Sequence, residues 1–448
     1  MRRTALKILH QTETQGAYLN LVFTDMLKDT HLSAVDVAFI KELVFGVFRN
    51  KILLDYVIRK NSSLRLKKID PKVLNILRMG AYQIFFMDKV PHHAAVSESV
   101  SLAKRYASLK SASFVNAVLR SMIRNSGKNN EIDLSSIKDK IEYLSTKYSY
   151  PLPLCEFLVN IYGERAESIM QASNESPDLC VRINTLKTTK EIFIEKLKAL
   201  DIRYEETPYT DCGLYLFGAT EEKRKKLSGL FTVQDQSSQL VSLALSPDEG
   251  DFVLDLCAAP GGKTTHLAEL MKNKGKIYAS DIYESRLKSV DYLAQNLGID
   301  IIKTKACDAC VLNDNWLLRA DKVLADVPCS GLGIIRRKPD IKYKENITDF
   351  TEINQIQYQI LYSAYRYLKP GGVLVYSTCT INPGENLELI EKFLKINPDI
   401  VLDSIENPHI TGHAKEQGKK GYIEIFPDTD KSDGFFMCRL KKLEGENR

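Results

Sequence analysis

The sequence lacks the segments that carry a protein into or across a membrane. Although 44% of its 448 residues are hydrophobic, no apolar run approaches the roughly 18 residues of a membrane span. Near the N-terminus, Lys7, His10 and Glu13 interrupt any signal-peptide core. We therefore expect a cytoplasmic protein with no membrane partner, and the length predicts two or three domains.

The cysteines lack the pattern of a disulfide scaffold or of a zinc site. Their number is nine, whereas disulfide frameworks use even numbers in short chains. The lone CxxC pair, Cys307 and Cys310, has no second pair nearby to complete the four ligands of structural zinc. We predict no metal site, and we expect Cys180, Cys257 and Cys438 to be buried apolar side chains.

Positive charge is only slightly in excess over negative charge. The net charge of +5 permits an anionic partner without identifying one. Basic side chains near the N-terminus form either a nucleic-acid-binding face or an ordinary solvated surface: Arg2, Arg3, Arg49, Lys51, Arg120 and Arg124. Two further groups, 223–226 and 336–338, are candidates for contacts with phosphates.

The first part of the chain predicts two small domains. Residues 1–128 read as an all-helical bundle, because Val73, Leu77 and Ile84 recur at helical spacing. The polar stretch 126–130 is a candidate linker. Residues 140–230 mix short helices and strands and predict a small α+β module, with strands at 179–184 and 214–217 and a helix at 192–200.

Residues 231–448 predict a Rossmann-like α/β domain. Apolar runs alternate with helical patterns, which is typical of a parallel sheet with right-handed crossovers. Two late strands, with no room for a helix between them, predict an antiparallel hairpin at one edge, at 422–426 and 435–440. The expected parallel strands are 252–257, 276–280, 299–305, 322–325 and 372–376.

The stretch from Phe252 to Thr265 predicts a strand, a glycine turn and a helix N-terminus. Backbone N–H groups and the helix dipole at such a turn face a ligand, although many such turns are only structural. A P-loop needs a glycine five residues before Gly262, where Cys257 stands instead. No GxGxxG motif is present either, so the turn is a candidate cradle for something other than a nucleotide phosphate.

Polar residues end the later strands, at the sheet edge where ligands bind. Asp281 follows Gly262 at the spacing of about 20 residues that is typical of a ribose-binding carboxylate. Asp308 follows the next strand, where an adenine edge would lie, and Asp326 ends the fourth. Ribose and adenine contacts without a diphosphate cradle favour S-adenosylmethionine over NAD as the cofactor.

Cys329 and Cys379 lie in polar loops at this same edge. A thiolate that adds to C6 of a pyrimidine makes C5 nucleophilic enough to accept a methyl group, after which the C5 proton and the thiolate must leave. The base must be unstacked for this reaction, which is easiest in the loops and single strands of RNA. From the residues alone, either cysteine can be the nucleophile.

These motifs resemble those of the Nol1/Nop2/Sun family of RNA cytosine-C5 methyltransferases. The N-terminal helices resemble a NusB-type RNA-binding bundle, on segments 42–47, 91–96 and 114–120. The combination covers nearly the whole chain and is similar to bacterial methyltransferases that act on 16S ribosomal RNA. The matching methyltransferase motifs are 181–185, 233–239, 255–264, 326–333, 377–379 and 433–436.

The resemblance implies a role for each candidate residue. Cys379 would add to C6 of the cytosine, and Cys329 would assist release of the methylated RNA. Asp326 would also lie near the cytosine edge, and a monomeric enzyme is expected. The implied cofactor contacts are Cys257, Ala258, Ala259, Pro260, Gly261, Gly262, Lys263, Asp281, Asp308 and Asp326.

Two other functions fit parts of the sequence. One is a non-catalytic ribosome-assembly factor that binds RNA through a vestigial methyltransferase fold, against which the intact loop and both cysteines argue. The other is a DNA cytosine methyltransferase with Cys329 as its nucleophile, against which the NusB-like bundle argues.

Overall fold

The computed structural model describes residues 1–28, 30, 32–126 and 131–444. They form two compact units, of which the first comprises 1–174 and 337–348 and the second 175–336 and 349–448. Residues 127–130 of the expected linker lie outside the described residues. No helix within the described ranges is long and apolar enough to cross a membrane.

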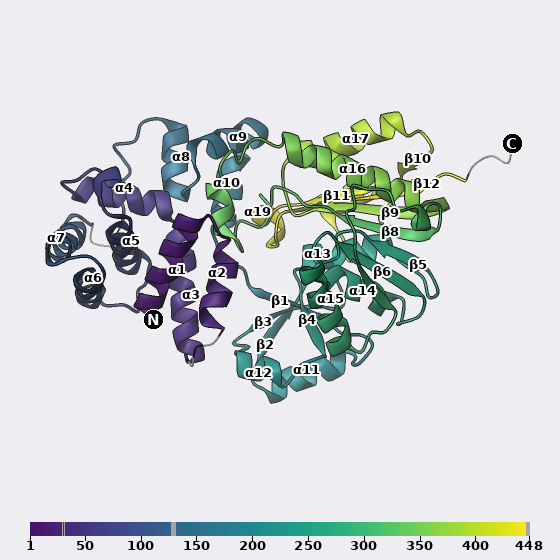
Figure 1. The fold of residues 1–448 in the computed structure, drawn as a ribbon, viewed down its shortest axis with the longest axis horizontal. Coiled ribbons are helices and arrows are strands. Elements are labelled where there is room, and N and C mark those ends of the chain that lie inside the picture. The colour runs from purple at the N-terminus through teal and green to yellow at the C-terminus, as the bar shows by residue number, and fades with distance from the viewer. Residues whose placement is uncertain (29, 31, 127–130, 445–448) are drawn as a thin grey trace. The chain divides into compact units, whose positions relative to one another are not determined.

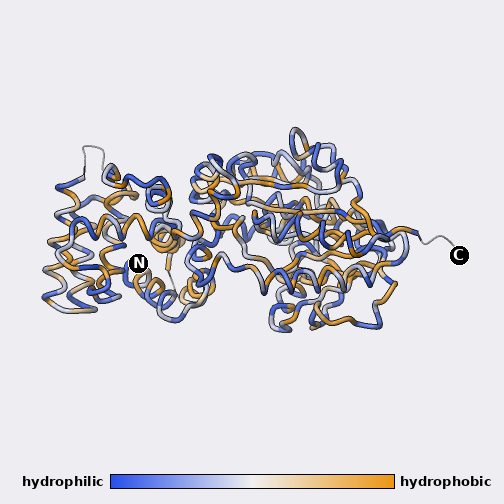
Figure 2. The backbone as a smooth tube through the Cα atoms, turned by 90° about the horizontal axis from the view of Figure 1, so that it is seen from above, coloured by the Kyte–Doolittle hydropathy of each residue, from blue (hydrophilic) through white to orange (hydrophobic). Residues whose placement is uncertain are grey.

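The first unit is helical (Figure 1). The predicted helix with Val73 and Leu77 is α5, where Pro71 occupies the first turn and the Asp70 carboxylate caps the helix by accepting from the Lys72 N–H. Apolar positions recur along these helices in Figure 2, and those of α1 to α7 form one core. The helices are α1 (Arg2–Gln15), α2 (Leu19–Leu27), α3 (Ala34–Arg49), α4 (Lys51–Asn61), α5 (Pro71–Phe86), α6 (His92–Tyr106), α7 (Leu109–Asn125), α8 (Lys140–Tyr148), α9 (Leu152–Tyr162) and α10 (Arg165–Ala172).

A late segment of the chain, 337–348, belongs to this helical unit. Its Lys342 is fully buried and donates to the carbonyls of Arg49 (2.9 Å) and Tyr148 (3.3 Å) and to Asn174 Oδ1 (3.0 Å). Burial lowers the pKa of Lys342 well below its ordinary value. Arg49 is itself buried, so the expectation that it lies on a basic face is wrong.

A small antiparallel sheet of order β2-β3-β1-β4 opens the second unit. The predicted strands at 179–184 and 214–217 are confirmed as β1 (Leu179–Ile183) and β3 (Gly213–Phe217), and the predicted helix as α11 (Lys190–Ala199). The basic run at 223–226 overlaps α12, where Lys225 and Lys226 form exposed ion pairs with glutamates. The other elements are β2 (Arg203–Glu206), α12 (Glu221–Lys225) and β4 (Phe231–Val233).

An eight-stranded sheet of order β10-β12-β9-β8-β5-β6-β7, with β11 also paired to β12, forms the rest of this unit. The five strands β5 to β9 are parallel to one another, as predicted, and β12 pairs antiparallel with β9. Two details correct the sequence analysis: β10 was not foreseen, and a one-turn helix, α19 (Pro427–Asp430), fits between β11 and β12. The strands are β5 (Phe252–Asp255), β6 (Lys276–Asp281), β7 (Ile302–Ala306), β8 (Ala320–Asp326), β9 (Leu368–Thr378), β10 (Ile400–Leu402), β11 (Tyr422–Ile425) and β12 (Phe435–Lys442).

Helices cover both faces of the large sheet (Figure 1). Alternate residues of one strand point to opposite faces, so Val375 packs with the α13–α15 side and Leu374 with the α16–α17 side. The carboxyl ends of β5 and β8 therefore meet where successive crossovers leave on opposite faces, which is the position of ligand sites in such sheets. The helices are α13 (Gln236–Leu245), α14 (Gly262–Leu270), α15 (Glu284–Leu297), α16 (Thr351–Tyr367), α17 (Leu387–Ile396) and α18 (Gly412–Lys419).

Candidate active site

The turn between β5 and α14 is a closely packed glycine loop. Gly261 has φ +108°, and a Cβ there would lie 3.0 Å from Val290 Cα, so only glycine fits without strain. The Ala258 N–H donates to the Ser280 carbonyl at 2.8 Å and ties the loop to β6. Helix α14 begins at Gly262, which directs the positive end of its dipole to this sheet edge.

Arg182 on β1 fastens the small sheet to this loop. It is fully buried and pairs with both carboxylate oxygens of Glu269 on α14, at 2.8 and 2.9 Å. It also donates to the Gly262 carbonyl at 2.7 Å and to the Gln234 side chain. The sequence showed Arg182 only as part of a family motif, and its role as a clamp depends on partners more than 50 residues away.

A buried carboxylate, Asp255, lies at the end of β5. Its Oδ2 accepts from Thr264 Oγ1 at 2.7 Å, while its Oδ1 is buried without a hydrogen-bond partner among the described residues. Burial raises the pKa of Asp255 to about 7. An unpartnered acceptor beside a glycine loop fits a ligand that brings a donor or a positive charge, as the ammonium and sulfonium groups of S-adenosylmethionine do.

Asp281 is the last residue of β6, and Asp308 lies just after β7. Asp281 is buried and accepts from Arg286 at 3.2 Å and from the Tyr283 N–H at 3.1 Å. Asp308 is exposed and accepts from the Cys310 N–H at 2.9 Å. Both carboxylates are thus held in one orientation at the edge where the sequence analysis expects ribose and adenine contacts.

Lys263 and Asp326 join the glycine loop to the end of β8. Lys263 Nζ lies 2.7 Å from Asp326 Oδ2, and Ser377 Oγ on β9 donates to Asp326 Oδ1 at 2.7 Å. Lys263 Nζ also lies 5.1 Å from the centre of the Phe435 ring. The candidate cofactor loop and the strand that leads to Cys379 are therefore connected through one carboxylate.

Cys329 and Cys379 are brought together from loops 50 residues apart, with sulfur atoms 3.3 Å from each other. Both are partly exposed and neither is part of a disulfide. The hydrogen bond to Cys379 and burial raise the pKa of Cys329 well above its ordinary value. The proton therefore stays on Cys329, which can donate to a thiolate on Cys379.

The other cysteines near the sheet differ in burial. Cys180 and Cys438 are buried, as predicted, but Cys257 is only partly buried. Burial and the carboxylate of Asp255 raise the pKa of Cys257 well above its ordinary value. Cys257 is thus a neutral thiol at the loop. No group of three or more metal-binding side chains occurs in the part of the chain that the structure describes.

Gly333 and Gly434 set how closely the Cys329 loop approaches β12. The Gly434 N–H donates to the Gly333 carbonyl at 2.8 Å, and the Gly333 N–H donates to the Cys379 carbonyl at 3.0 Å. A Cβ on Gly333 would lie 1.9 Å from the Gly434 oxygen. Through Gly434, the motif at 433–436 therefore holds the backbone next to the two cysteines in place. The position of the motif in the sequence did not predict this contact.

Arg336, a candidate for RNA phosphates, is buried. Its Nη1 donates to the Ser432 carbonyl at 3.1 Å, and its Nε lies 4.0 Å from an Asp433 oxygen. The expectation that Arg336 grips a polynucleotide is wrong, because the side chain braces the segment before β12.

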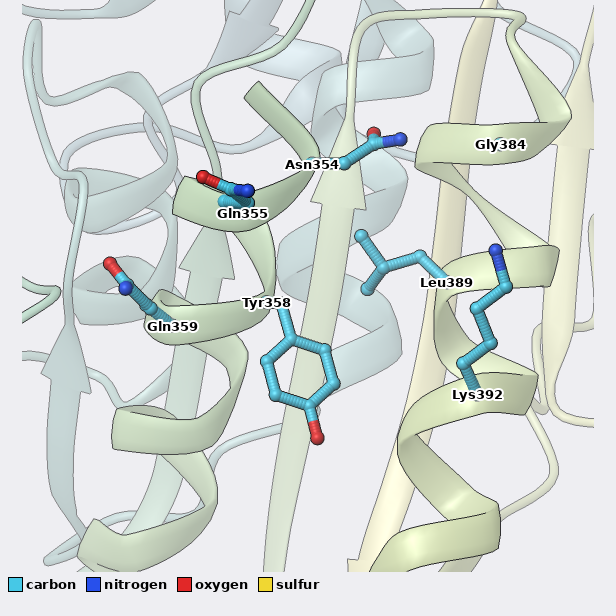
Figure 3. Close-up of a pocket in the computed structure, with 7 residues that line it drawn as sticks. All are labelled: Asn354, Gln355, Tyr358, Gln359, Gly384, Leu389 and Lys392. Atoms are coloured by element: carbon cyan, nitrogen blue, oxygen red, sulfur yellow. The ribbon is translucent and has the colours of Figure 1, made fainter. Parts of the chain in front are cut away.

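A surface pocket of about 290 Å³ lies between α16 and α17. In Figure 3 the side chains of Tyr358 and Leu389 lie between these two helices, and that of Lys392 runs along α17. Gly384 also lines the pocket, one residue before the buried Glu385. The pocket is lined by neither cysteine and by no residue of the glycine loop, and none of its lining residues was predicted as a site residue.

Three segments of the chain match known families. Residues 242–441 match the family described as 16S rRNA methyltransferase RsmB/F. Residues 1–124 match the NusB family, and residues 150–221 match an RsmF/B-like ferredoxin-like domain.

Whole-length similarity to individual proteins agrees with these matches. The chain is 35% identical to the probable ribosomal RNA small subunit methyltransferase B of Bacillus subtilis, over 99% of this chain and 98% of that protein. It is 30% identical to ribosomal RNA small subunit methyltransferase B of Proteus mirabilis, with the same coverage. The crystal structure of PH0851 superimposes with a TM-score of 0.78 at 28% identity, over 98% of both chains. This chain therefore belongs to the RsmB/F family of S-adenosylmethionine-dependent methyltransferases that carry a NusB domain.

Proposed function

We propose that this protein methylates C5 of a cytosine in 16S ribosomal RNA, with Cys379 as the covalent nucleophile. The observation that carries the proposal is the pair of sulfur atoms 3.3 Å apart at the ends of β8 and β9, beside the Lys263–Asp326 ion pair. Such a pair supplies one thiol that can add to C6 of the cytosine and a second thiol that keeps its proton.

The two cysteines account for covalent attachment to the cytosine and for release from it. The Cys379 thiolate adds to C6, which breaks the C5–C6 double bond and makes C5 nucleophilic. S-adenosylmethionine supplies the electrophilic methyl group that C5 takes. Loss of the C5 proton to a base then restores the double bond and expels the Cys379 thiolate. Cys329 lies close enough to exchange a proton with the departing sulfur, which supports a role in release.

The cofactor contacts follow the same edge. The loop from Cys257 to Lys263 would hold the methionine part, with the unpartnered Oδ1 of Asp255 as an acceptor for its ammonium group. Asp281 would bind the ribose hydroxyls and Asp308 the adenine edge. Asp326, which Lys263 and Ser377 orient at the end of β8, would lie near the cytosine edge. The NusB-like helices of the first unit would bind the surrounding RNA.

The test uses labelled S-adenosylmethionine and transcribed 16S ribosomal RNA. Cys379→Ser is expected to abolish transfer and adduct formation, whereas Cys329→Ser is expected to trap a protein–RNA adduct that survives denaturing electrophoresis. Cys212→Ser, a half-buried cysteine outside this edge, is the matched control and should keep wild-type activity. Full activity of Cys379→Ser refutes the nucleophile assignment. Equal labelling of 23S ribosomal RNA or of DNA refutes the substrate assignment.

A non-catalytic assembly factor remains the competing function. It requires neither the thiol pair nor a ligand at the glycine loop. It predicts no binding of S-adenosylmethionine by calorimetry, whereas methyl transfer predicts binding that Asp281→Asn weakens.

A further inference from the structure

Glu385 is a fully buried carboxylate in the short 3₁₀ turn Pro383–Glu385, just before α17. Its Oε2 accepts from the Ser330 N–H at 2.8 Å, and its Oε1 accepts from the Ser330 hydroxyl at 2.5 Å. Ser330 directly follows Cys329, so the carboxylate holds the Cys329 loop through one backbone N–H and one side-chain hydroxyl.

The same turn also holds the Cys379 loop. Thr378 Oγ1 donates to Asn386 Oδ1 at 2.6 Å, and Asn386 Nδ2 donates to the Thr380 carbonyl at 3.0 Å. The two threonines flank Cys379 on either side. Adjacent residues, Glu385 and Asn386, therefore fix the two cysteine loops relative to each other.

Glu385 is surrounded by neutral hydrogen-bond donors. They include Gln357 Nε2 at 2.9 Å and Asn382 Nδ2 at 3.0 Å, and all its hydrogen-bond donors among the described residues are neutral. A buried carboxylate without a cation is costly to the fold. Its two oxygens accept from four groups at 3.0 Å or less, which one amide oxygen of glutamine cannot match.

We infer that Glu385 is a positioning residue that sets the distance between Cys329 and Cys379. It touches neither sulfur and acts through Ser330. Its effect on catalysis rests on the proposed function, but its effect on the thiol geometry does not. Formation of a Cys329–Cys379 disulfide measures that geometry directly, since the S–S bond forms only in a narrow range of positions.

The experiment oxidises the full-length protein with diamide and follows the Cys329–Cys379 disulfide by peptide mass spectrometry. Each disulfide removes two protons and two electrons from the thiols, and one diamide takes them up to become the hydrazine. Glu385→Gln is expected to form this disulfide at least about tenfold more slowly, because its NH₂ group must face the Ser330, Gln357 or Asn382 donors. Glu388→Gln is the matched control, because Glu388 is an exposed carboxylate on α17, and it should behave as wild type.

Kinetics then separate positioning from a loss of folding. Glu385→Gln is expected to lower kcat at least about 100-fold while the Kd for S-adenosylmethionine stays within about twofold, since the glycine loop is untouched. If Glu385→Gln fails to fold, Ser330→Ala is the second variant: it keeps the N–H bond to Glu385 and removes the hydroxyl bonds to Glu385 and to Thr380. It should slow the disulfide by a smaller factor. Gln359→Ala on the exposed side of α16 should change nothing.

The experiments distinguish failure of the positioning role of Glu385 from failure of the proposed function. A wild-type rate of disulfide formation in Glu385→Gln, or in Ser330→Ala where Glu385→Gln does not fold, overturns the positioning role. A slow rate in Glu385→Gln together with no methyl transfer by the wild-type protein keeps the positioning role and overturns the proposed function.

Discussion

The sulfur atoms of Cys329 and Cys379 lie 3.3 Å apart, just beyond the last aligned pair of the parallel strands β8 and β9, in which Asp326 lies opposite Ser377. The two thiols are not equivalent. The hydrogen bond to Cys379 and burial raise the pKa of Cys329 well above its ordinary value, so Cys329 stays protonated at neutral pH.

This asymmetry predicts the order in which the cysteines react with iodoacetamide. Because the thiolate is the reactive form and the pKa of Cys329 is raised, Cys329 should be the slower of the two cysteines to be alkylated at pH 8. The rate at Cys329 should rise only well above pH 9, as its raised pKa is approached. Peptide mass spectrometry after timed labelling measures both rates, with the buried Cys438 as an unlabelled internal control. Faster labelling of Cys329 would contradict the assignment.

The site residues that end strands can be predicted from the sequence. Asp326 and Cys379 were predictable because apolar runs mark the strands and parallel strands end at one edge. Glu385 and Arg182 were not, because each acts through partners 28 to 87 residues away that only the fold brings near. The three-residue strand β10 carries too short a pattern to read, and it exists through its pairing with β12.

Arg182→Met should strongly destabilise the second unit. The side chain is fully buried against Glu269 and the Gly262 carbonyl, and removing one partner of a buried ion pair costs about 3–5 kcal/mol. Urea unfolding measures the loss. Arg203→Met, an exposed arginine on the same small sheet, should change the free energy of unfolding by less than about 0.5 kcal/mol. The double variant Arg182→Met/Glu269→Leu should recover part of the loss, because no uncompensated charge remains.

Gly333→Ala should damage the cysteine loop. Its Cβ would lie 1.9 Å from the Gly434 carbonyl oxygen and 2.8 Å from that of Cys379, so backbone must move. We expect a loss of about 1–3 kcal/mol in the free energy of unfolding and slower disulfide formation between Cys329 and Cys379. Gly384→Ala is the matched control, since its Cβ would meet only the Asn382 side chain at 3.4 Å or more. Equal behaviour of the two variants would show that the close approach is unimportant.

Asp255→Asn should change how stability depends on pH. Burial raises the pKa of Asp255 from 3.8 to about 7, so between these values the folded protein binds a proton that the unfolded chain has lost. Stability from this group therefore falls as pH rises from about 4 to about 7 and is constant above that. In Asp255→Asn this loss is absent, so its free energy of unfolding relative to wild type should rise by up to about 4 kcal/mol across that window. Urea unfolding at pH 5 and pH 8 measures the difference, with the exposed Asp248→Asn as the control. A difference that does not grow with pH would mean that Asp255 is ionised in the folded protein, and that the Thr264 hydroxyl and nearby Lys263 outweigh its burial.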